Sequence, residues 1–360
     1  MRAYFDHNAT APLDAEVRAA MAACEEESYG NAASRHAEGR AAHEAVERAR
    51  AQVARAVNAR PEEVIFTSSG TESNNLLVKG VAARSTKKVV AASGVEHPCV
   101  LCAARAVADG PGEKVFMPLA VDAEGVVELA DVEAALASGD VALLSVMLAN
   151  NESGVLQDVA ALAKLAAGRT AVHTDAAQAL GKIEVDFAAL GVDAMTLSAH
   201  KARGPKGIAA LIAKEELEFA PLHDGGGQEK GLRSGTLNVA GIVGFGVAAE
   251  LAAARAAAEG ERLAGLRTRL EERLRADGAT IFGAGAARLP NTTYFGYPGI
   301  EGESLVVMLD QNGFALASGS ACASTKNEPS HVLLAMGCTE EQARTAVRCS
   351  LGLESDAEQV

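Results

Sequence analysis

A chain of 360 residues, of which 49% are hydrophobic and 22% charged, is long enough to form two compact domains with substantial cores. Its formal net charge of −14 excludes non-specific binding to nucleic acids or anionic membranes, which requires clustered Lys and Arg. We expect a cytoplasmic protein, because no apolar run approaches the roughly 20 residues that span a bilayer, the N-terminus lacks the apolar core of a secretory signal, and the scattered cysteines form no disulfide framework.

The first predicted feature is a series of βα units between residues 64 and 213. Short apolar runs alternate there with helical patterns such as residues 155–167, where leucine and valine recur at helical spacing. This alternation predicts an α/β fold with a mostly parallel, buried sheet, whose ligands gather at the carboxyl ends of the strands. The predicted strands are residues 64–67, 88–91, 115–117, 141–146, 170–173, 194–197 and 208–212.

The composition changes after Asn238. An alanine-rich helical tract over residues 239–276 is followed by a β-like run at 292–297, a helix at 303–311 and two more helices. We therefore predict a large domain over residues 13–250 and a smaller α+β domain from residues 1–12 and 251–360, hinged by the long helix.

Gly70 and Thr71 follow the first predicted strand and open a helix. Small residues there let backbone N–H groups approach an anion, the helix N-terminus adds the positive end of its dipole, and Thr71 adds a hydroxyl. The segment is not a P-loop, because no Gly-Lys-Ser/Thr follows. A simple helix N-cap is the alternative interpretation.

Lys201 stands where a buried strand gives way to the glycine-rich loop 204–207. A lysine in this setting can hold an aldehyde as a Schiff base when local electrostatics favour its neutral amine, and a surface lysine in a turn is the alternative. Asp175 ends the preceding strand, where it could meet a cation such as a protonated pyridine nitrogen, and Gln178 could donate to a phenolate oxygen. The alternative for Asp175 is an ordinary turn aspartate.

Four further side chains could carry chemistry. His97 follows a predicted strand, and its imidazole could stack on a planar ring and relay protons; a structural histidine is the alternative. Asn150 follows another predicted strand and could reach the same crevice; a capping asparagine is the alternative. Cys322 lies in a loop of small polar residues, whereas structural cysteines sit in apolar packing, and a nucleophilic thiol requires access. Arg348 could clamp a carboxylate bidentately. The alternative for Cys322 is a thiol without a catalytic role, and the alternative for Arg348 is a surface ion pair.

Two motifs are set aside. Cys99 and Cys102 form a CxxC, but no second pair follows at zinc-site spacing, so we expect two packed thiols in a helix and no metal site. Residues 244–249 match GxGxxA without a preceding strand or a suitable acid downstream, so these glycines are expected to permit close helix packing.

Taken in order, the candidate residues form one pattern. Over nearly its whole length the chain resembles the cysteine desulfurases, pyridoxal 5′-phosphate enzymes of aminotransferase fold type I that serve iron–sulfur cluster assembly. The segments that carry the resemblance are residues 6–10, 30–36, 67–75, 96–97, 150–152, 175–178, 198–201, 204–207, 225–229, 233–236 and 318–322.

The resemblance implies a seven-stranded sheet between helices and a role for each matching residue. Lys201 would bind the aldehyde of the cofactor, Asp175 would pair with its pyridine nitrogen, and Gln178 would contact its ring hydroxyl. His97 would stack on the ring and assist proton transfer. The residues that would hold the phosphate are Gly70, Thr71, Ser198 and His200, together with Thr236, which would reach it across a homodimer interface.

The implied reaction converts L-cysteine to L-alanine. Asn150, beside the cofactor, and Arg348 would orient the substrate carboxylate, and Cys322 would take the sulfur as a persulfide for an acceptor protein in iron–sulfur cluster assembly or thiolation. The loop at 318–329 resembles that of the branch with a longer, mobile cysteine loop. The alternatives are a selenocysteine lyase or another aminotransferase-like enzyme of this fold, and a sulfur carrier on a retired fold.

Overall fold

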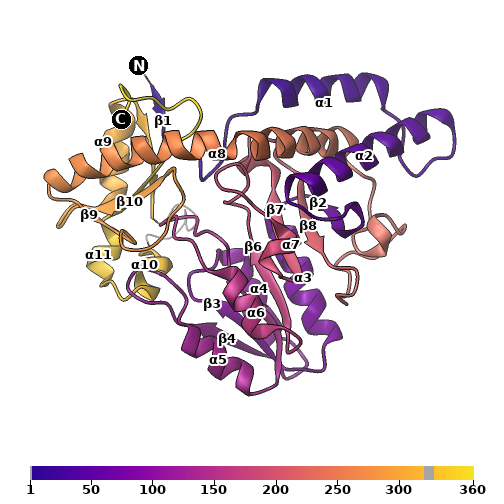
Figure 1. The fold of residues 1–360 in the computed structure, drawn as a ribbon, viewed down its shortest axis with the longest axis horizontal. Coiled ribbons are helices and arrows are strands. Elements are labelled where there is room, and N and C mark those ends of the chain that lie inside the picture. Colours follow the sequence, from indigo (N-terminus) through magenta and orange to yellow (C-terminus); the bar gives the residue numbers. More distant parts are fainter. Residues whose placement is uncertain (1, 320–327) are drawn as a thin grey trace.

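The computed structural model describes residues 2–319 and 328–360, whose two larger sheets lie at opposite ends of the molecule and are connected along one side by a long helix (Figure 1). The larger sheet contains seven strands and is built from residues between 64 and 213. The smaller sheet, of four strands, comes from the last third of the chain.

The larger sheet confirms the predicted α/β class. Its strand order is β2-β8-β7-β6-β5-β3-β4, in which β8 is antiparallel to both neighbours and the other pairs are parallel. Short runs of Val, Ile, Leu and Ala form the inner strands, because both of their faces are buried. The strands are β2 (Val64–Thr67), β3 (Val89–Ser93), β4 (Val115–Leu119), β5 (Val141–Ser145), β6 (Ala171–Asp175), β7 (Ala194–Ser198) and β8 (Ala209–Ala213).

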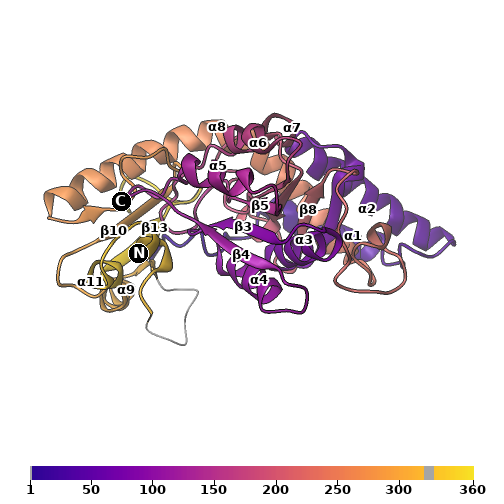
Figure 2. The same ribbon diagram turned by 90° about the horizontal axis from the view of Figure 1, so that it is seen from below.

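Helices cover both faces of this sheet (Figure 2). One hydrophobic core joins the sheet to α2 (Ala37–Ala56), α5 (Leu129–Ala137), α6 (Val159–Ala166), α7 (Phe187–Leu190) and the long helix. A second core, on the other face, joins it to α3 (Gly70–Arg84) and α4 (Pro98–Ala108). Helix α6 is shorter than the predicted 155–167, because Asp158 caps its N-terminus.

The long helix α8 (Val239–Ala276) connects the two sheets. It packs against α2 and α1 (Ala15–Glu27), and at Gly246 an added Cβ would lie 2.8 Å from the Cα of Ala49, so glycine is needed for this close approach. Close helix packing is therefore confirmed for these glycines. By length and composition α8 is apolar enough to cross a membrane, but the burial of residues such as Phe245 in the protein core accounts for its apolar character.

The smaller sheet has the order β12-β13-β10-β9 and is antiparallel. The first strand of the chain, β1, pairs with β11, and Asp6 bridges to Ser350, so the N-terminal segment lies against the C-terminal part (Figure 1). The remaining elements are β1 (Ala3–Tyr4), β9 (Thr280–Ile281), β10 (Thr292–Gly296), α9 (Gly302–Gln311), β11 (Phe314–Ala315), β12 (Ala317–Ser318), α10 (His331–Ala335), α11 (Glu340–Arg344), β13 (Ala346–Ser350) and the short turns η1 (Pro61–Glu63), η2 (Ala199–Lys201) and η3 (Glu229–Gly231).

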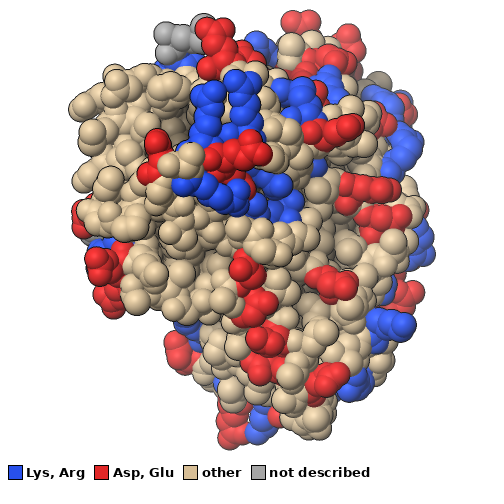
Figure 3. Space-filling view, turned by 60° about the vertical axis from the view of Figure 1, so that its left-hand side comes forward, with Lys and Arg blue, Asp and Glu red and all other residues tan. Residues whose placement is uncertain are grey.

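The surface around this smaller sheet mixes charges of both signs. On the face drawn in Figure 3, Lys and Arg lie directly beside Asp and Glu, and broad areas carry neither. In the same part of the chain, Arg262 pairs with Glu259 at 2.8 Å. Much of the positive charge on this face is therefore balanced locally.

A buried histidine in the central sheet should make stability depend on pH. His173 contacts the hydroxyls of Ser145 (2.9 Å) and Thr196 (3.1 Å), and burial lowers its pKa from 6.5 to about 4. Between these two pH values the unfolded chain binds a proton that the folded chain does not, so stability falls as the pH drops through this range, by up to about 3 kcal/mol.

The variant His173→Gln keeps polar atoms between the two hydroxyls but cannot be protonated. We expect urea unfolding of the variant to lose less stability between about pH 7 and pH 4.5 than unfolding of the unaltered protein. The difference between the two profiles isolates His173 from other buried histidines. Identical slopes would contradict the assignment.

Candidate active site

A cavity of about 230 Å³ opens at the carboxyl ends of β6 and β7 and the N-termini of α3 and α4. Eight of the residues predicted from the sequence line it: Gly70, Thr71, His97, Asp175, Gln178, Ser198, His200 and Lys201. Asn150, Thr236 and Arg348 do not line it, and Cys322 lies outside the described residues. Side chains that are far apart in the sequence thus converge where a mostly parallel sheet binds its ligands.

One end of the cavity is suited to an anion. Helix α3 begins at Gly70, and its first N–H groups face the cavity beside the residues Thr71 and Ser198. Ser69 caps the helix by accepting a hydrogen bond from the backbone N–H of Glu72 at 3.1 Å. The N-cap and the anion site are therefore compatible, because capping occupies one of the exposed N–H groups and leaves others for a ligand.

His200 lies at the same end of the cavity and is neutral. Burial lowers its pKa to about 4, and its Nδ1 lies 3.1 Å from the hydroxyl of Thr10. A neutral imidazole can still donate one N–H to a phosphate oxygen.

Asp175 lines the same cavity from the last position of β6. Its carboxylate is buried and accepts hydrogen bonds from the Asn74 amide (2.7 Å) and the backbone N–H of Ala177 (2.9 Å). It forms no ion pair with residues in the described part of the chain. A buried carboxylate beside a cavity favours a cationic partner, and a protonated ring nitrogen meets that requirement.

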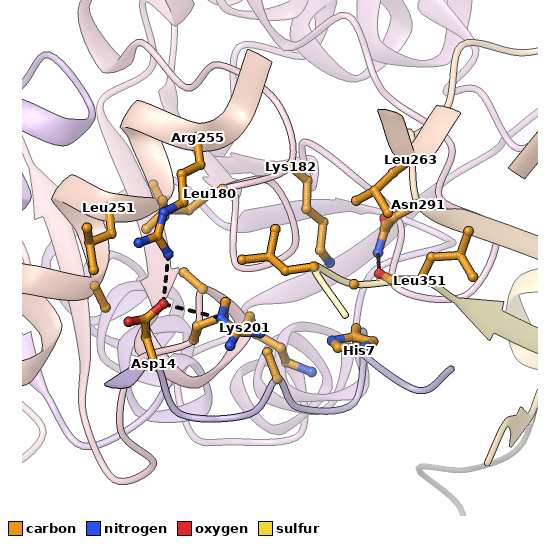
Figure 4. Close-up of a pocket in the computed structure, with 18 residues that line it drawn as sticks. His7, Asp14, Leu180, Lys182, Lys201, Leu251, Arg255, Leu263, Asn291 and Leu351 are labelled. Carbon is orange, nitrogen blue, oxygen red and sulfur yellow. Dashed lines mark hydrogen bonds and ion pairs between the residues drawn. The ribbon is translucent and has the colours of Figure 1, made fainter. Parts of the chain in front are cut away.

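Lys201 forms part of the wall between two cavities. Its Nζ donates to the backbone carbonyls of Asn8 and, at 2.9 Å, of Ala9. Figure 4 shows it from the second, smaller cavity, of about 60 Å³, where Asp14 and Arg255 pair at 2.7 Å. The turn η2 directly after β7 brings this amine to the carboxyl edge of the sheet.

Asn8 connects the lysine to its surroundings. Its backbone carbonyl accepts from Gln178 Nε2 at 2.9 Å as well as from Lys201, and its side-chain oxygen accepts from Lys182 Nζ at 2.8 Å. Its side-chain amide donates to the hydroxyl of Thr292, in the smaller sheet, at 2.9 Å. One residue of the N-terminal segment therefore links the cavity to both sheets.

Lys182 is a residue that the sequence analysis did not single out. It is buried, its Nζ donates to Gln178 Oε1 at 2.6 Å, and burial holds its pKa well below the usual range. By occupying the amide oxygen of Gln178, it leaves that side chain to act as a hydrogen-bond donor. A lone lysine among small residues carries no sequence pattern that could have signalled this role.

His97 both caps α4 and lines the cavity. Its Nδ1 accepts a hydrogen bond from the backbone N–H of Cys99 at 3.2 Å. Burial lowers the pKa of the imidazole, with Asp175 acting in the opposite direction. The structural and functional interpretations of this histidine are thus both compatible with its position.

Asn150 lies in a buried turn and does not line the cavity. Its amide donates to the carbonyl of Val95 at 2.9 Å, and its oxygen accepts from the backbone N–H groups of Glu152 and Ser153, both at 2.9 Å. These bonds fully occupy the side chain in holding a buried turn, which is the capping alternative. The neighbouring Asn151 lines the cavity instead, and its buried side-chain oxygen has no hydrogen-bond partner among the described residues.

Arg348 approaches the cavity from β13 of the smaller sheet. Its guanidinium donates to Asp6 at 2.6 Å and to the backbone carbonyl of Asn151 at 2.9 Å. The side chain is buried, and its Nε lacks a hydrogen-bond partner within the described part of the protein. Thr236, by contrast, is exposed on this single chain.

Comparisons with known proteins agree with this geometry. Residues 3–360 match the family model of class-V aminotransferases. A protein named cysteine desulfurase IscS, from Dictyoglomus turgidum, is 43% identical over 99% of this chain and 91% of its own. Among solved structures, a NifS-like protein has a TM-score of 0.92 at 37% identity, covering 100% of this chain and 96% of that one. A structure described as SspA in complex with cysteine has a TM-score of 0.84 at 30% identity, covering 98% and 99%.

The fold and the cavity thus define a pyridoxal-phosphate-dependent enzyme of the aminotransferase class. With these relatives matched over nearly their full length, the chain belongs to the class-V aminotransferase family and, within it, to the cysteine desulfurases.

The residues of the cavity fit the cofactor of this family. The buried carboxylate of Asp175 suits the pyridinium nitrogen, the N-terminus of α3 with Thr71 and Ser198 suits the phosphate, and Lys201 suits the aldehyde. These groups come from β6, β7, α3 and η2 and line one cavity, so a single ligand that carries both a ring nitrogen and a phosphate can contact all of them.

Replacing the aspartate tests this fit. In Asp175→Asn the shape of the side chain is kept, but the charge that holds a proton on the ring nitrogen is lost. We expect the kcat of the enzyme to fall by about a hundredfold or more, because removal of one preorganised electrostatic group from an active site typically has an effect of this size. The cofactor should still bind, which its absorption band reports, and an unchanged melting temperature controls for folding. Turnover near that of the unaltered enzyme would contradict the pairing.

Proposed function

We propose that this protein removes sulfur from L-cysteine, releases L-alanine and holds the sulfur as a persulfide on Cys322. The observation that carries the proposal is the meeting of Lys201, Asp175 and His97 around one cavity. The names of the relatives, cysteine desulfurases at 40 to 43% identity, support the same substrate.

The proposed reaction balances without an external oxidant. The Cβ–Sγ bond of the substrate breaks, its electron pair stays on carbon, and Cβ takes up a proton to give alanine. The sulfur forms an S–S bond with the enzyme thiol, so the two sulfurs are together oxidised by the two electrons that reduce Cβ. L-cysteine and the enzyme thiol thus yield L-alanine and an enzyme persulfide.

Bound in the cavity, pyridoxal phosphate supplies an electron sink for the pair released at the substrate Cα. Lys201 Nζ takes the proton from that carbon, since an amine that leaves the carbonyls of Asn8 and Ala9 can act as a base in this position. His97, neutral because burial lowers its pKa, is the second group that can hold a proton beside the ring. The carboxylate of Asp175 keeps the ring nitrogen protonated.

The substrate carboxylate is assigned to Arg348 and Asn151. Arg348 carries a buried Nε without a hydrogen-bond partner among the described residues, and Asn151, whose backbone it contacts, lines the cavity. A planar guanidinium beside an amide recognises a carboxylate by two or more hydrogen bonds. The contact between Arg348 and Asp6 would then hold the guanidinium in place.

The partners follow from the same proposal. Cys322 would pass its sulfur to an acceptor protein for iron–sulfur cluster assembly or thiolation, and the chain would work as a homodimer in which Thr236 reaches the phosphate of the other subunit. The exposure of Thr236 on the single chain is compatible with such an interface. A cytoplasmic location is supported by the scattered cysteines, since those in the described residues are all free.

The test follows sulfur and alanine together. Without added thiol, L-cysteine should give about one alanine per site, with one extra sulfur on the peptide that contains Cys322, because the persulfide blocks a second turnover. With a thiol reductant, alanine and sulfide should form continuously in equal amounts. Pyruvate as the product, or alanine without enzyme-bound sulfur, would overturn the proposal.

A further inference from the structure

Two side chains to which neither the sequence analysis nor the proposed reaction gives a catalytic or binding role lie between Asp175 and His97. Asn74 belongs to α3, and its amide nitrogen lies 2.7 Å from Asp175 Oδ2 and 3.1 Å from Cys99 Sγ. Cys99 belongs to α4, and its Sγ lies 2.9 Å from His97 Nδ1. The thiol that was expected to be merely packed therefore lines the cavity in contact with the histidine.

The direction of each hydrogen bond follows from its neighbours. His97 Nδ1 already accepts the backbone N–H of Cys99 at 3.2 Å, so it bears a lone pair and no proton. The sulfur receives an N–H from Asn74 and a hydroxyl hydrogen bond from Thr71. The remaining contact of the sulfur, with Nδ1, is then made by its own S–H. Burial raises the pKa of the thiol to about 12, so this proton is present at neutral pH.

We propose that Asn74 and Cys99 are positioning residues that hold His97 as the neutral tautomer with its proton on Nε2. These groups form a chain of hydrogen bonds, called the relay below. It runs from the carboxylate of Asp175 through the two N–H groups of Asn74 and the S–H of Cys99 to the imidazole of His97. It fixes both the ring nitrogen that carries the proton and the plane of the ring, since two donors converge on Nδ1.

The relay has a consequence for protonation. A donor to Nδ1 stabilises the neutral imidazole and so opposes its charging. The other groups that influence His97 come from three elements: Asp175 of β6, which favours the charged form, and Lys201 of η2 and His331 of α10, which oppose it. In the resting site His97 therefore presents an N–H at Nε2. Nε2 can act as a base only if the hydrogen bonds to Nδ1 are broken and the proton moves from Nε2 to Nδ1.

The matched variants are Cys99→Ala and Cys99→Ser. They leave nearly the same space and differ in one hydroxyl, which can replace the S–H as a donor. NMR of the histidine ring nitrogens in the holoenzyme, with the His97 signal identified by its absence from His97→Asn, reports the tautomer and the pKa directly. We expect Cys99→Ala to raise the pKa of His97 by about 0.5 to 1 unit, because only the backbone N–H of residue 99 still donates to Nδ1, while Cys99→Ser stays near the unaltered protein.

Three outcomes would overturn the inference: an Nδ1–H tautomer in the unaltered protein, equal shifts in the serine and alanine variants, or no shift in the alanine variant. A packing defect alone would affect both variants alike. If the site were disturbed too far in either, Asn74→Ala, which removes only the donor to sulfur and to Asp175, should still weaken the Nε2–H preference. The catalytic meaning of the relay rests on the proposed function, but the NMR result does not, so an inactive enzyme with the expected tautomer would refute only the function.

Discussion

Replacing Lys201 by alanine should abolish turnover of L-cysteine. The variant loses the amine that binds the cofactor aldehyde and the base that moves the Cα proton, and proton transfer alone contributes roughly 10² to 10⁴-fold to such reactions. Because Lys201 also donates to the carbonyls of Asn8 and Ala9, its removal leaves space at the wall between the two cavities.

Absorption and borohydride reduction separate these effects. Lys201→Ala should be colourless or bind the cofactor only non-covalently, so that reduction attaches no cofactor to the protein. Lys88→Ala, which removes an exposed lysine paired with Glu113, serves as the control and should behave as the unaltered enzyme does. Covalent cofactor in Lys201→Ala would show that another amine forms the bond, and the buried Lys182 would be the first to examine.

Replacing Cys322 by alanine should eliminate sulfur transfer while leaving the cofactor in place. The thiol is required as the acceptor of the substrate sulfur, so its loss removes an S–S bond-forming step for which no solvent group substitutes well. We expect the release of alanine from L-cysteine to fall by about 10³-fold or more, since the activated nucleophile is lost. The absorption band of the bound cofactor should remain.

The control is Cys102→Ala, because Cys102 is an exposed thiol that belongs to α4. It should keep full activity. Undiminished desulfuration by Cys322→Ala would exclude the persulfide route, and a variant that retained activity only towards selenocysteine would point to a lyase. Both substrates are therefore measured with each variant.

Much of the fold could be predicted from the sequence, because a buried parallel sheet imposes short apolar runs with helical patterns between them. The runs at 64–67 and 141–146 correspond closely to β2 and β5. Strands of the smaller sheet were harder to recognise. β13, which contains Arg348, was not anticipated, since its five residues alternate polar and apolar types no more clearly than a turn does.

The site was predictable where chemistry restricts a residue to one type at a strand end, as at Asp175 and Lys201. The site was not predictable where two adjacent residues of the same type differ only in where their side chains point. Asn150 and Asn151 are indistinguishable in sequence. The turn that places only Asn151 on the cavity is held by a bond from Asn150 to the carbonyl of Val95 and by one from Arg348 to the carbonyl of Asn151, both across long sequence separations. Lys182 and Cys99 were missed for the same reason, because their roles depend on contacts across elements.

The path of the N-terminal segment has a consequence for the growing polypeptide. The strand β1 finds its pairing partner only at Phe314–Ala315, and Asp6 its bridge only at Ser350, yet the carbonyl of Asn8 between them contacts Lys201. Residues 3–8 can therefore reach these positions only after residues up to Ser350 have been synthesised, even though the larger sheet can form earlier. The contact of Asn8 with Lys201, at the wall of the coenzyme pocket, therefore forms late in synthesis.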